Sequence, residues 1–137
     1  MKLKITLLLL FFVGITAFAQ AQTVSNMDIT ETAEAVVNRQ LDAYNARDID
    51  RFVATYSEDI EIYKKGVLIM KGHQQLRESY DPFFKTTPNL YCRIENRILI
   101  NNKVIDKENV TANERRLEAV AIYEVSEGKI QKVTFVD

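Results

Sequence analysis

The sequence predicts an α+β domain in which an antiparallel sheet is covered by helices on one face. Three observations support this architecture. Helical periodicity dominates the chain from Ala33 to Phe84, whereas everything after Pro88 is rich in strand-forming residues separated by turns. Separate runs of helices and strands are typical of α+β domains. The chain also shows no repeats, low-complexity tracts or linkers, which indicates one layered unit with a single core.

The helices are predicted from residues spaced three and four positions apart. Gln40 is the one polar residue in the stripe of the first helix, whose members are Ala33, Val36, Val37, Gln40, Leu41 and Tyr44. Asp48 follows a break in this pattern and is placed to cap a second, short helix. A third helix is predicted over residues 73–84, where Pro82 marks the point at which a regular helix must end or kink.

A strand over residues 59–64 follows the second helix, and a tight turn joins it to a strand over residues 67–70. Beyond Pro88, turn signals predict a meander of four strands over residues 90–100, 103–111, 116–125 and 129–136. In the first of these, alternation separates two faces, Cys92, Ile94, Ile98 and Ile100 against Tyr91, Arg93, Glu95 and Arg97. The last two strands are apolar on both sides, which predicts a second buried contact, such as a homodimer interface on the outer sheet face.

Residues 1–19 are predicted to be a secretory signal peptide, because Lys2 and Lys4 precede an apolar run that ends in small residues. Cleavage is expected after Ala19 or Ala21, which leaves one domain over residues 23–137. The apolar run is shorter than the roughly 20 residues that a membrane-spanning helix needs, and a retained N-terminal anchor is the alternative. We therefore expect an exported protein, in a bacterial periplasm or outside the cell, with no membrane contact after cleavage.

Charge and composition argue against several classes of partner. Removal of the signal peptide leaves 16 basic and 19 acidic residues, a balance that gives no sign of nucleic-acid binding. Cys92 is the only cysteine and His73 the only histidine, so the chain cannot form an intramolecular disulfide, a thiolate cluster or a metal site built on a histidine cluster. The expected cleavage points also lack the cysteine that a lipid anchor requires. We expect no metal and no cofactor.

Three short segments carry a resemblance to a known family. They are YNARD at residues 44–48, YSED at 56–59 and YEVSEGKI at 123–130. With the order of elements, they resemble the nuclear transport factor 2-like superfamily, and its SnoaL-like and ketosteroid-isomerase-like branch looks closest. The resemblance covers the chain from about Thr30 to its end. It implies a cone-shaped fold, with a curved, mostly antiparallel sheet wrapped around three helices and open at one end to a cavity. Many members dimerise through the sheet.

The same resemblance argues against steroid isomerisation. Ketosteroid isomerases use a tyrosine and a protonated aspartic acid as oxyanion donors and a second aspartate as the base. These three positions fall on Gln40, Ala121 and Lys64 in this chain. An amide is a weaker donor than a phenol, alanine donates nothing, and a protonated lysine cannot accept a proton.

Several residues remain candidates for a site inside the cone. A buried Gln40 needs a hydrogen-bond partner, which is either a ligand or the protein itself. Lys64 either reaches the cavity mouth or lies in solvent. Asp106 and Glu108 share one face of a strand. If that face points inward, burial raises the pKa of a carboxyl group and creates a general acid or base. The surface alternative is favoured for Glu108, and both remain open for Asp106.

Three functions are consistent with these residues. The first is binding of a small, largely apolar molecule, with ligand contacts from Gln40, Tyr44, Tyr56, Lys64, Tyr80, Phe84 and Asp106. The second is a cofactor-free isomerase or lyase, with Asp106 as the catalytic base and Gln40 or Tyr63 as the donor. The third is a dimeric interaction module that binds no ligand.

Overall fold

The computed structural model describes residues 31–136, so the predicted signal peptide and its cleavage sites lie outside the described residues. The helical half comprises α1 (Ala33–Ala46), α2 (Ile49–Ala54) and α3 (Gly72–Thr86), with β1 (Tyr56–Lys64) and β2 (Val67–Lys71) between the second and third helices. The meander that follows consists of β3 (Tyr91–Ile100), β4 (Lys103–Ala112), β5 (Arg115–Ser126) and β6 (Lys129–Phe135).

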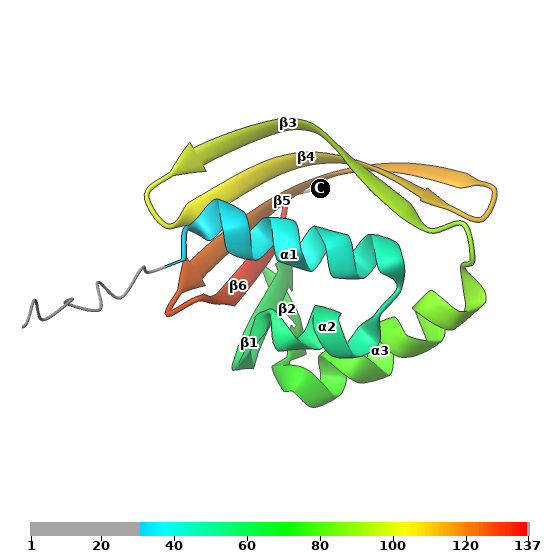
Figure 1. Ribbon diagram of the computed structural model, residues 1–137, viewed down its shortest axis with the longest axis horizontal. Helices are drawn as coiled ribbons and strands as arrows, with labels where there is room; N and C mark the ends of the chain where they lie inside the picture. Colours follow the sequence, from blue (N-terminus) through cyan, green and yellow to red (C-terminus); the bar gives the residue numbers. More distant parts are fainter. Residues whose placement is uncertain (1–30, 137) are drawn as a thin grey trace, which may run out of the picture.

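The six strands form one sheet in the order β2-β1-β6-β5-β4-β3. Every neighbouring pair is antiparallel except β1 and β6, which run parallel. The sheet is open at its edges and curves around α1, while α2 and α3 lie beyond that helix, with α3 against β1 and β2 (Figure 1). The predicted α+β class and the curved, mostly antiparallel sheet around three helices are therefore confirmed.

Local hydrogen bonds fix the helix boundaries. Thr32 caps α1 by accepting from the backbone N–H of Ala35, at 3.2 Å. Arg47 ends that helix in the left-handed conformation, with φ of 54°, and Asp48 caps α2 by accepting from the N–H of Arg51. These bonds satisfy amide groups that the first turn of a helix leaves without intrahelical partners. The break predicted at Asp48 is thus confirmed.

A β-bulge in β3 changes which side chains face the helices. Ile94 pairs with Glu108, but Asn96 pairs with Lys107, so β3 has one residue more than β4 at this point. An extra residue reverses the alternation of the strand beyond it. Arg97 consequently points to the concave side, whereas Ile98 is 56% exposed on the opposite face. The predicted faces are wrong for Arg97, Ile98 and Ile100, because that prediction assumed an unbroken strand.

The core lies between the helices and the concave face of the sheet. Four rings from the three helices meet at its centre, with centroids 4.7 to 6.4 Å apart, and they belong to Tyr44, Phe52, Tyr80 and Phe84. The Asn45 side chain ties the end of α1 to β3 by bonding both the N–H and the carbonyl of Cys92. Cys92 is buried. Within residues 31–136, no helix combines the length and apolar character needed to cross a membrane.

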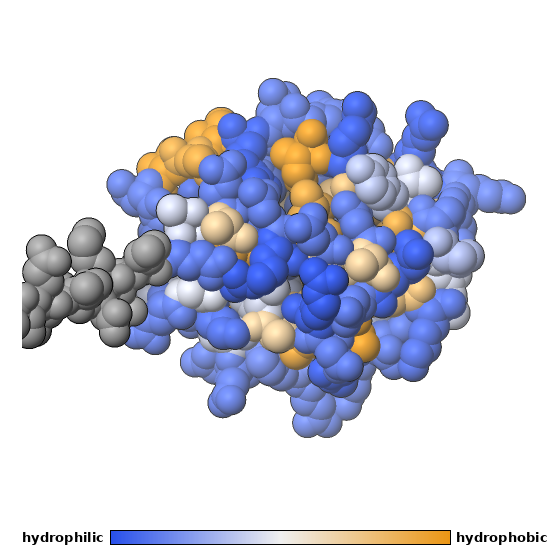
Figure 2. Space-filling view, viewed as in Figure 1, coloured by the Kyte–Doolittle hydropathy of each residue, from blue (hydrophilic) through white to orange (hydrophobic). Residues whose placement is uncertain are grey.

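Some apolar surface remains on the outside. Figure 2 shows apolar residues gathered at the end of the molecule where β3 turns into β4, and Ile98, Leu99 and Ile100 are each more than half exposed there. On the convex face, Ile98 lies opposite Ile105, and Ile105 lies opposite Ile122. Three neighbouring strands therefore present a row of isoleucines away from the core.

Candidate functional site

A cavity of about 160 Å³ lies between α1, α3 and the concave face of the sheet. Its walls come from every strand except β2 and are mainly apolar or aromatic. The lining residues are Gln40, Leu41, Tyr44, Tyr56, Ile62, Tyr80, Phe83, Cys92, Glu108, Val110, Leu117, Ala119, Tyr123, Val133 and Phe135. Leu117 is 51% exposed, so the cavity approaches solvent at the start of β5.

Gln40 and Tyr56 form the first polar pair in this cavity. The Gln40 Nε2 group donates to the Tyr56 hydroxyl at 3.0 Å, and both side chains are buried. Burial raises the pKa of Tyr56 well above its usual value, so this phenol stays protonated at physiological pH. Because its oxygen accepts from Gln40, its own O–H remains available to donate. The hydrogen-bond partner that a buried Gln40 needs is thus Tyr56, the first residue of β1.

Glu108 and Tyr123 form the second polar pair. The Tyr123 hydroxyl donates to Oε1 of Glu108 at 2.6 Å, and the glutamate is only 7% exposed. Burial raises the Glu108 pKa to about 7, the Tyr123 hydrogen bond opposes that rise, and the nearby Asp106 carboxylate adds to it. Glu108 therefore exchanges a proton near neutral pH inside an apolar cavity. The surface position favoured for it from sequence is wrong.

Asp106 faces inward but lies outside the cavity. Nε and Nη2 of Arg97 each donate to one of its carboxylate oxygens at 2.7 Å, and Asp106 is 1% exposed. The hydrogen bonds to Asp106 are also the main reason that the pKa of Arg97 is raised. Nη1 of Arg97 extends the network to Asn38 on α1. A carboxylate held by two charge-assisted bonds and closed off from the cavity is poorly placed to act as a base.

The other predicted site residues divide into two groups. Tyr44 and Tyr80 line the cavity beside Gln40 and Tyr56, as the ligand-binding prediction requires. Phe84 is buried in the aromatic cluster behind the wall, and Lys64 is exposed at the end of β1. Tyr63 points to the convex face, where its hydroxyl donates to Glu61 and Lys132 lies 4.8 Å from its ring centre. The structure therefore places Phe84, Lys64 and Tyr63 away from the cavity.

Sequence reasoning favoured the surface for Glu108 and did not name Tyr123 as a site residue. The signal for Glu108 was present, because Val104, Asp106, Glu108 and Val110 alternate along β4 and all four are buried. Because this strand face carries two acids, sequence reasoning favoured a position on the outer surface for Glu108. Tyr123 lies opposite Val104 in the sheet register, a pairing that periodicity alone does not reveal.

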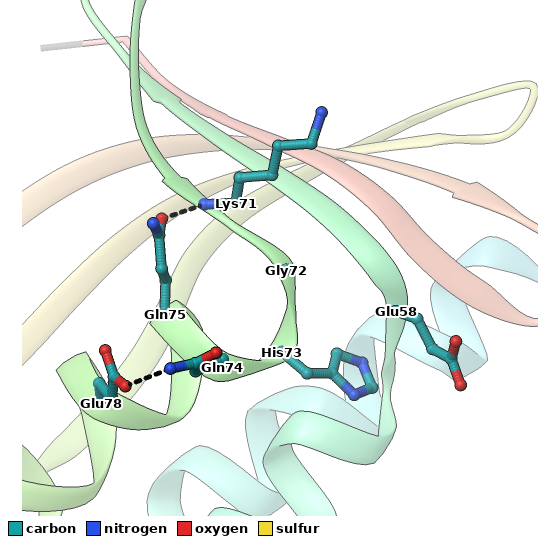
Figure 3. Close-up of a pocket in the computed structure, with 7 residues that line it drawn as sticks. All are labelled: Glu58, Lys71, Gly72, His73, Gln74, Gln75 and Glu78. Atoms are coloured by element: carbon teal, nitrogen blue, oxygen red, sulfur yellow. Dashed lines mark hydrogen bonds between the residues drawn. The ribbon is translucent and has the colours of Figure 1, made fainter.

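A second, open hollow lies at the start of α3, with a volume of about 590 Å³ (Figure 3). Gly72 begins the helix there with φ of +77°, a conformation that favours glycine. The His73 ring points toward Glu58 in Figure 3, and its Nε2 lies 2.9 Å from the carbonyl oxygen of Tyr56. His73 is half-buried. Among the described residues, no group of three or more His, Cys, Asp or Glu side chains could hold a metal ion.

A family model described as the SnoaL-like domain matches residues 37–133, which include the whole sheet except the last two residues of β6 and span both polar pairs. The chain belongs to the SnoaL-like domain family. This finding confirms the predicted resemblance to the SnoaL-like branch of the nuclear transport factor 2-like superfamily. A SnoaL-like domain encloses its cavity between helices and a curved sheet, and such a fold is suited to binding small molecules.

Solved structures support the same fold. An uncharacterised cystatin-fold protein from Novosphingobium aromaticivorans has a TM-score of 0.71 at 22% identity, and the match covers 78% of this SnoaL-like chain and 99% of that one. A proposed ketosteroid isomerase from Kribbella flavida has a TM-score of 0.64 at 23% identity, with 78% of each chain covered. A proposed polyketide cyclase from Sinorhizobium meliloti has a TM-score of 0.64 at 15% identity, covering 73% of this chain and 92% of that one. No curated protein is significantly similar to the chain. At these identities the likeness establishes the fold alone.

Proposed function

We propose that this SnoaL-like domain binds a small, largely apolar molecule in the cavity between α1, α3 and the sheet. The observation that carries the proposal is a mainly apolar wall interrupted by two buried, hydrogen-bonded pairs, Gln40 with Tyr56 and Glu108 with Tyr123. Apolar walls with a few convergent polar groups are the usual form of a ligand site. The polar pairs orient the ligand, and the walls supply most of its contact area.

The cavity volume limits the size of the ligand. An engineered cavity of about 150 Å³ in another protein stays dry and binds benzene, so a volume of about 160 Å³ suits a molecule of similar size. Sites for drug-sized ligands usually measure about 300 to 1,000 Å³. A larger ligand would have to extend past Leu117 into solvent.

Filling the cavity tests this proposal. Ala119 lines the cavity, whereas Val120, the next residue of β5, lies on the convex face. Ala119→Phe should abolish the ligand-induced thermal shifts found in a metabolite screen, because the added ring occupies the ligand's volume. Val120→Phe adds a ring to the same strand outside the cavity and should leave those shifts unchanged. Equal shifts for the parent and Ala119→Phe would place the ligand elsewhere.

A cofactor-free isomerase or lyase is the second candidate, and the Glu108 carboxyl favours it. A general acid or base works best when its pKa lies near the working pH, and burial raises the Glu108 pKa to about 7. Tyr56 would donate to an oxygen of the substrate while Glu108 moves a proton. In this proposal Glu108 takes the role that the sequence suggested for Asp106.

The variant Glu108→Gln separates binding from catalysis. An amide of the same shape accepts the Tyr123 hydrogen bond but cannot transfer a proton at neutral pH. If the domain is an enzyme, this variant should bind substrate and lose at least about 100-fold in turnover, the usual contribution of general acid–base catalysis. Turnover that survives the substitution would rule out Glu108 as the proton carrier.

We also propose that the domain is exported and forms a homodimer through the convex face of the sheet. The isoleucine row at positions 98, 105 and 122 supports the dimer, because apolar side chains gathered on an outer face often mark protein contacts. Light scattering should give twice the chain mass for the parent and the single mass for Ile105→Lys. A monomeric parent would contradict the dimer.

The intact mass of the exported protein should match a chain that begins at Gln20 or Gln22. The mass of the uncleaved chain would contradict the signal peptide.

A further inference from the structure

The cavity contains an acid whose charge has no counterpart. Within residues 31–136, Glu108 is the only lining residue with a carboxyl group, and the lining includes no lysine, arginine or histidine. The charge of Arg97, on the neighbouring strand, also acts on Glu108, but Nε and Nη2 of Arg97 both donate to Asp106. Buried charges in proteins are normally paired. Ionised Glu108 therefore leaves one negative charge in the cavity.

Aromatic rings surround the same space. Six lining residues are aromatic, and they come from two helices and three strands: Tyr44, Tyr56, Tyr80, Phe83, Tyr123 and Phe135. Ring faces attract cations lying within about 6 Å, and aromatic cages are a known way to hold quaternary ammonium groups. Rings around a single carboxylate, without a competing cation among the lining residues, form a site that favours positive charge.

We infer that the preferred ligand is a small organic cation of the alkylated ammonium class, whose methyl groups contact the rings while its charge pairs with the Glu108 carboxylate. This inference rests on the proposed binding function of the same cavity and names its ligand class. An alkylated ammonium group presents mainly apolar surface, which agrees with the cavity walls. The ion is also compact: tetramethylammonium and choline are close in size to the benzene ring that a cavity of this volume accommodates.

Proton and cation then compete for one carboxyl group. The groups facing Glu108 are Asp106 on its own strand, Tyr123 on β5, Cys92 and Arg97 on β3, Tyr44 on α1, Tyr56 on β1 and Tyr80 on α3. Burial raises the pKa of the tyrosine and cysteine groups well above neutrality, so they stay uncharged, and Asp106 remains paired with Arg97. Glu108 is thus the group whose ionisation controls cation binding near pH 7.

Choline and its uncharged isostere 3,3-dimethylbutan-1-ol test the inference directly. Their shapes match, and only the charge differs. Titration calorimetry near pH 8 should show choline binding at least about tenfold more tightly than the alcohol, as expected for a desolvated cation among rings and a carboxylate. Choline affinity should fall roughly 30-fold between pH 8 and pH 5.5, because the ionised fraction of an acid with pKa near 7 falls by that factor. Affinity for the alcohol should not fall with pH in this way.

Three variants add independent measurements. Glu108→Gln should remove both the preference for choline and its pH dependence, while the alcohol still binds. Tyr80→Phe keeps the ring and should change choline affinity less than twofold, whereas Tyr80→Leu removes the ring and should weaken it about fivefold.

Equal or tighter binding of the alcohol near pH 8 would overturn the cation inference and leave the proposed small-molecule function standing. Failure of both compounds to bind the parent near pH 8 overturns the cation inference. The proposed binding function would be overturned only if, in addition, the metabolite screen gave no thermal shift that Ala119→Phe abolishes.

Discussion

Glu108→Gln should change how stability depends on pH. The Glu108 pKa is about 7 in the folded protein, against an ordinary value of 4.5, because burial penalises the charged form. The folded chain therefore binds this proton more tightly than the unfolded chain does. Protonated Glu108 contributes to the free energy of unfolding. This contribution is fully present below pH 4.5, falls as the pH rises, and is lost above about pH 7.

The loss amounts to about 3 kcal/mol, since each unit of pKa difference corresponds to about 1.4 kcal/mol. Glutamine resembles the protonated acid at every pH, so the variant escapes the loss. Urea denaturation should give similar free energies of unfolding near pH 4.5, and the variant should be more stable by up to about 3 kcal/mol near pH 8.

Glu118→Gln is the matched control, because Glu118 is exposed on β5. Its stability difference from the parent should stay nearly constant with pH. All other titrating groups are shared by parent and variant, so they cancel in each difference. A stability difference for Glu108→Gln that does not grow between pH 5 and pH 8 would refute the reasoning, as would a variant that loses stability relative to the parent.

Three further substitutions test the packing around the site by urea denaturation. Arg97→Met leaves the Asp106 carboxylate buried without its partner and should cost about 3 to 5 kcal/mol, most of it recovered in the double variant Arg97→Met, Asp106→Leu. No recovery would contradict the ion-pair explanation. Asn45→Ala leaves both backbone groups of Cys92 unpaired and should cost about 1 to 3 kcal/mol, whereas a neutral result would mean that water replaces the amide. Leu76→Ala opens a cavity at a fully buried position and should cost about 2 to 5 kcal/mol, and a smaller loss would indicate local collapse.

The helices and turns could be predicted because their determinants are local. Asp48 caps α2 through a neighbour three residues away, and the stripe containing Gln40 is visible within one helix. Pro82 lies inside α3, which continues to Thr86, so the helix does not end at the proline. The predicted third helix was therefore too short by two residues at its end.

The candidate site depended on contacts between distant segments. The bulge at Ile94 and Asn96 is defined only relative to β4, so no alternation within β3 could reveal it. That bulge turns Arg97 inward and gives Asp106 its partner, which leaves Glu108 as the unpaired acid. The sequence showed both acids on one strand face, but their roles depend on the cation that the neighbouring strand supplies.

By itself, the sequence determined the class of fold, the order of its elements and the family, because periodicity, caps and turn residues act over a few positions. Gln40, Tyr44, Tyr56 and Tyr80 were predicted together as ligand contacts, and the structure places all four on the wall of one cavity. Only the tertiary structure decided that Glu108 and Tyr123 meet in the cavity and that Asp106, Lys64 and Tyr63 stay outside it. The physical reason is that burial and ion pairing, which set the charge of a carboxyl group, arise from the packing of strands far apart in the chain.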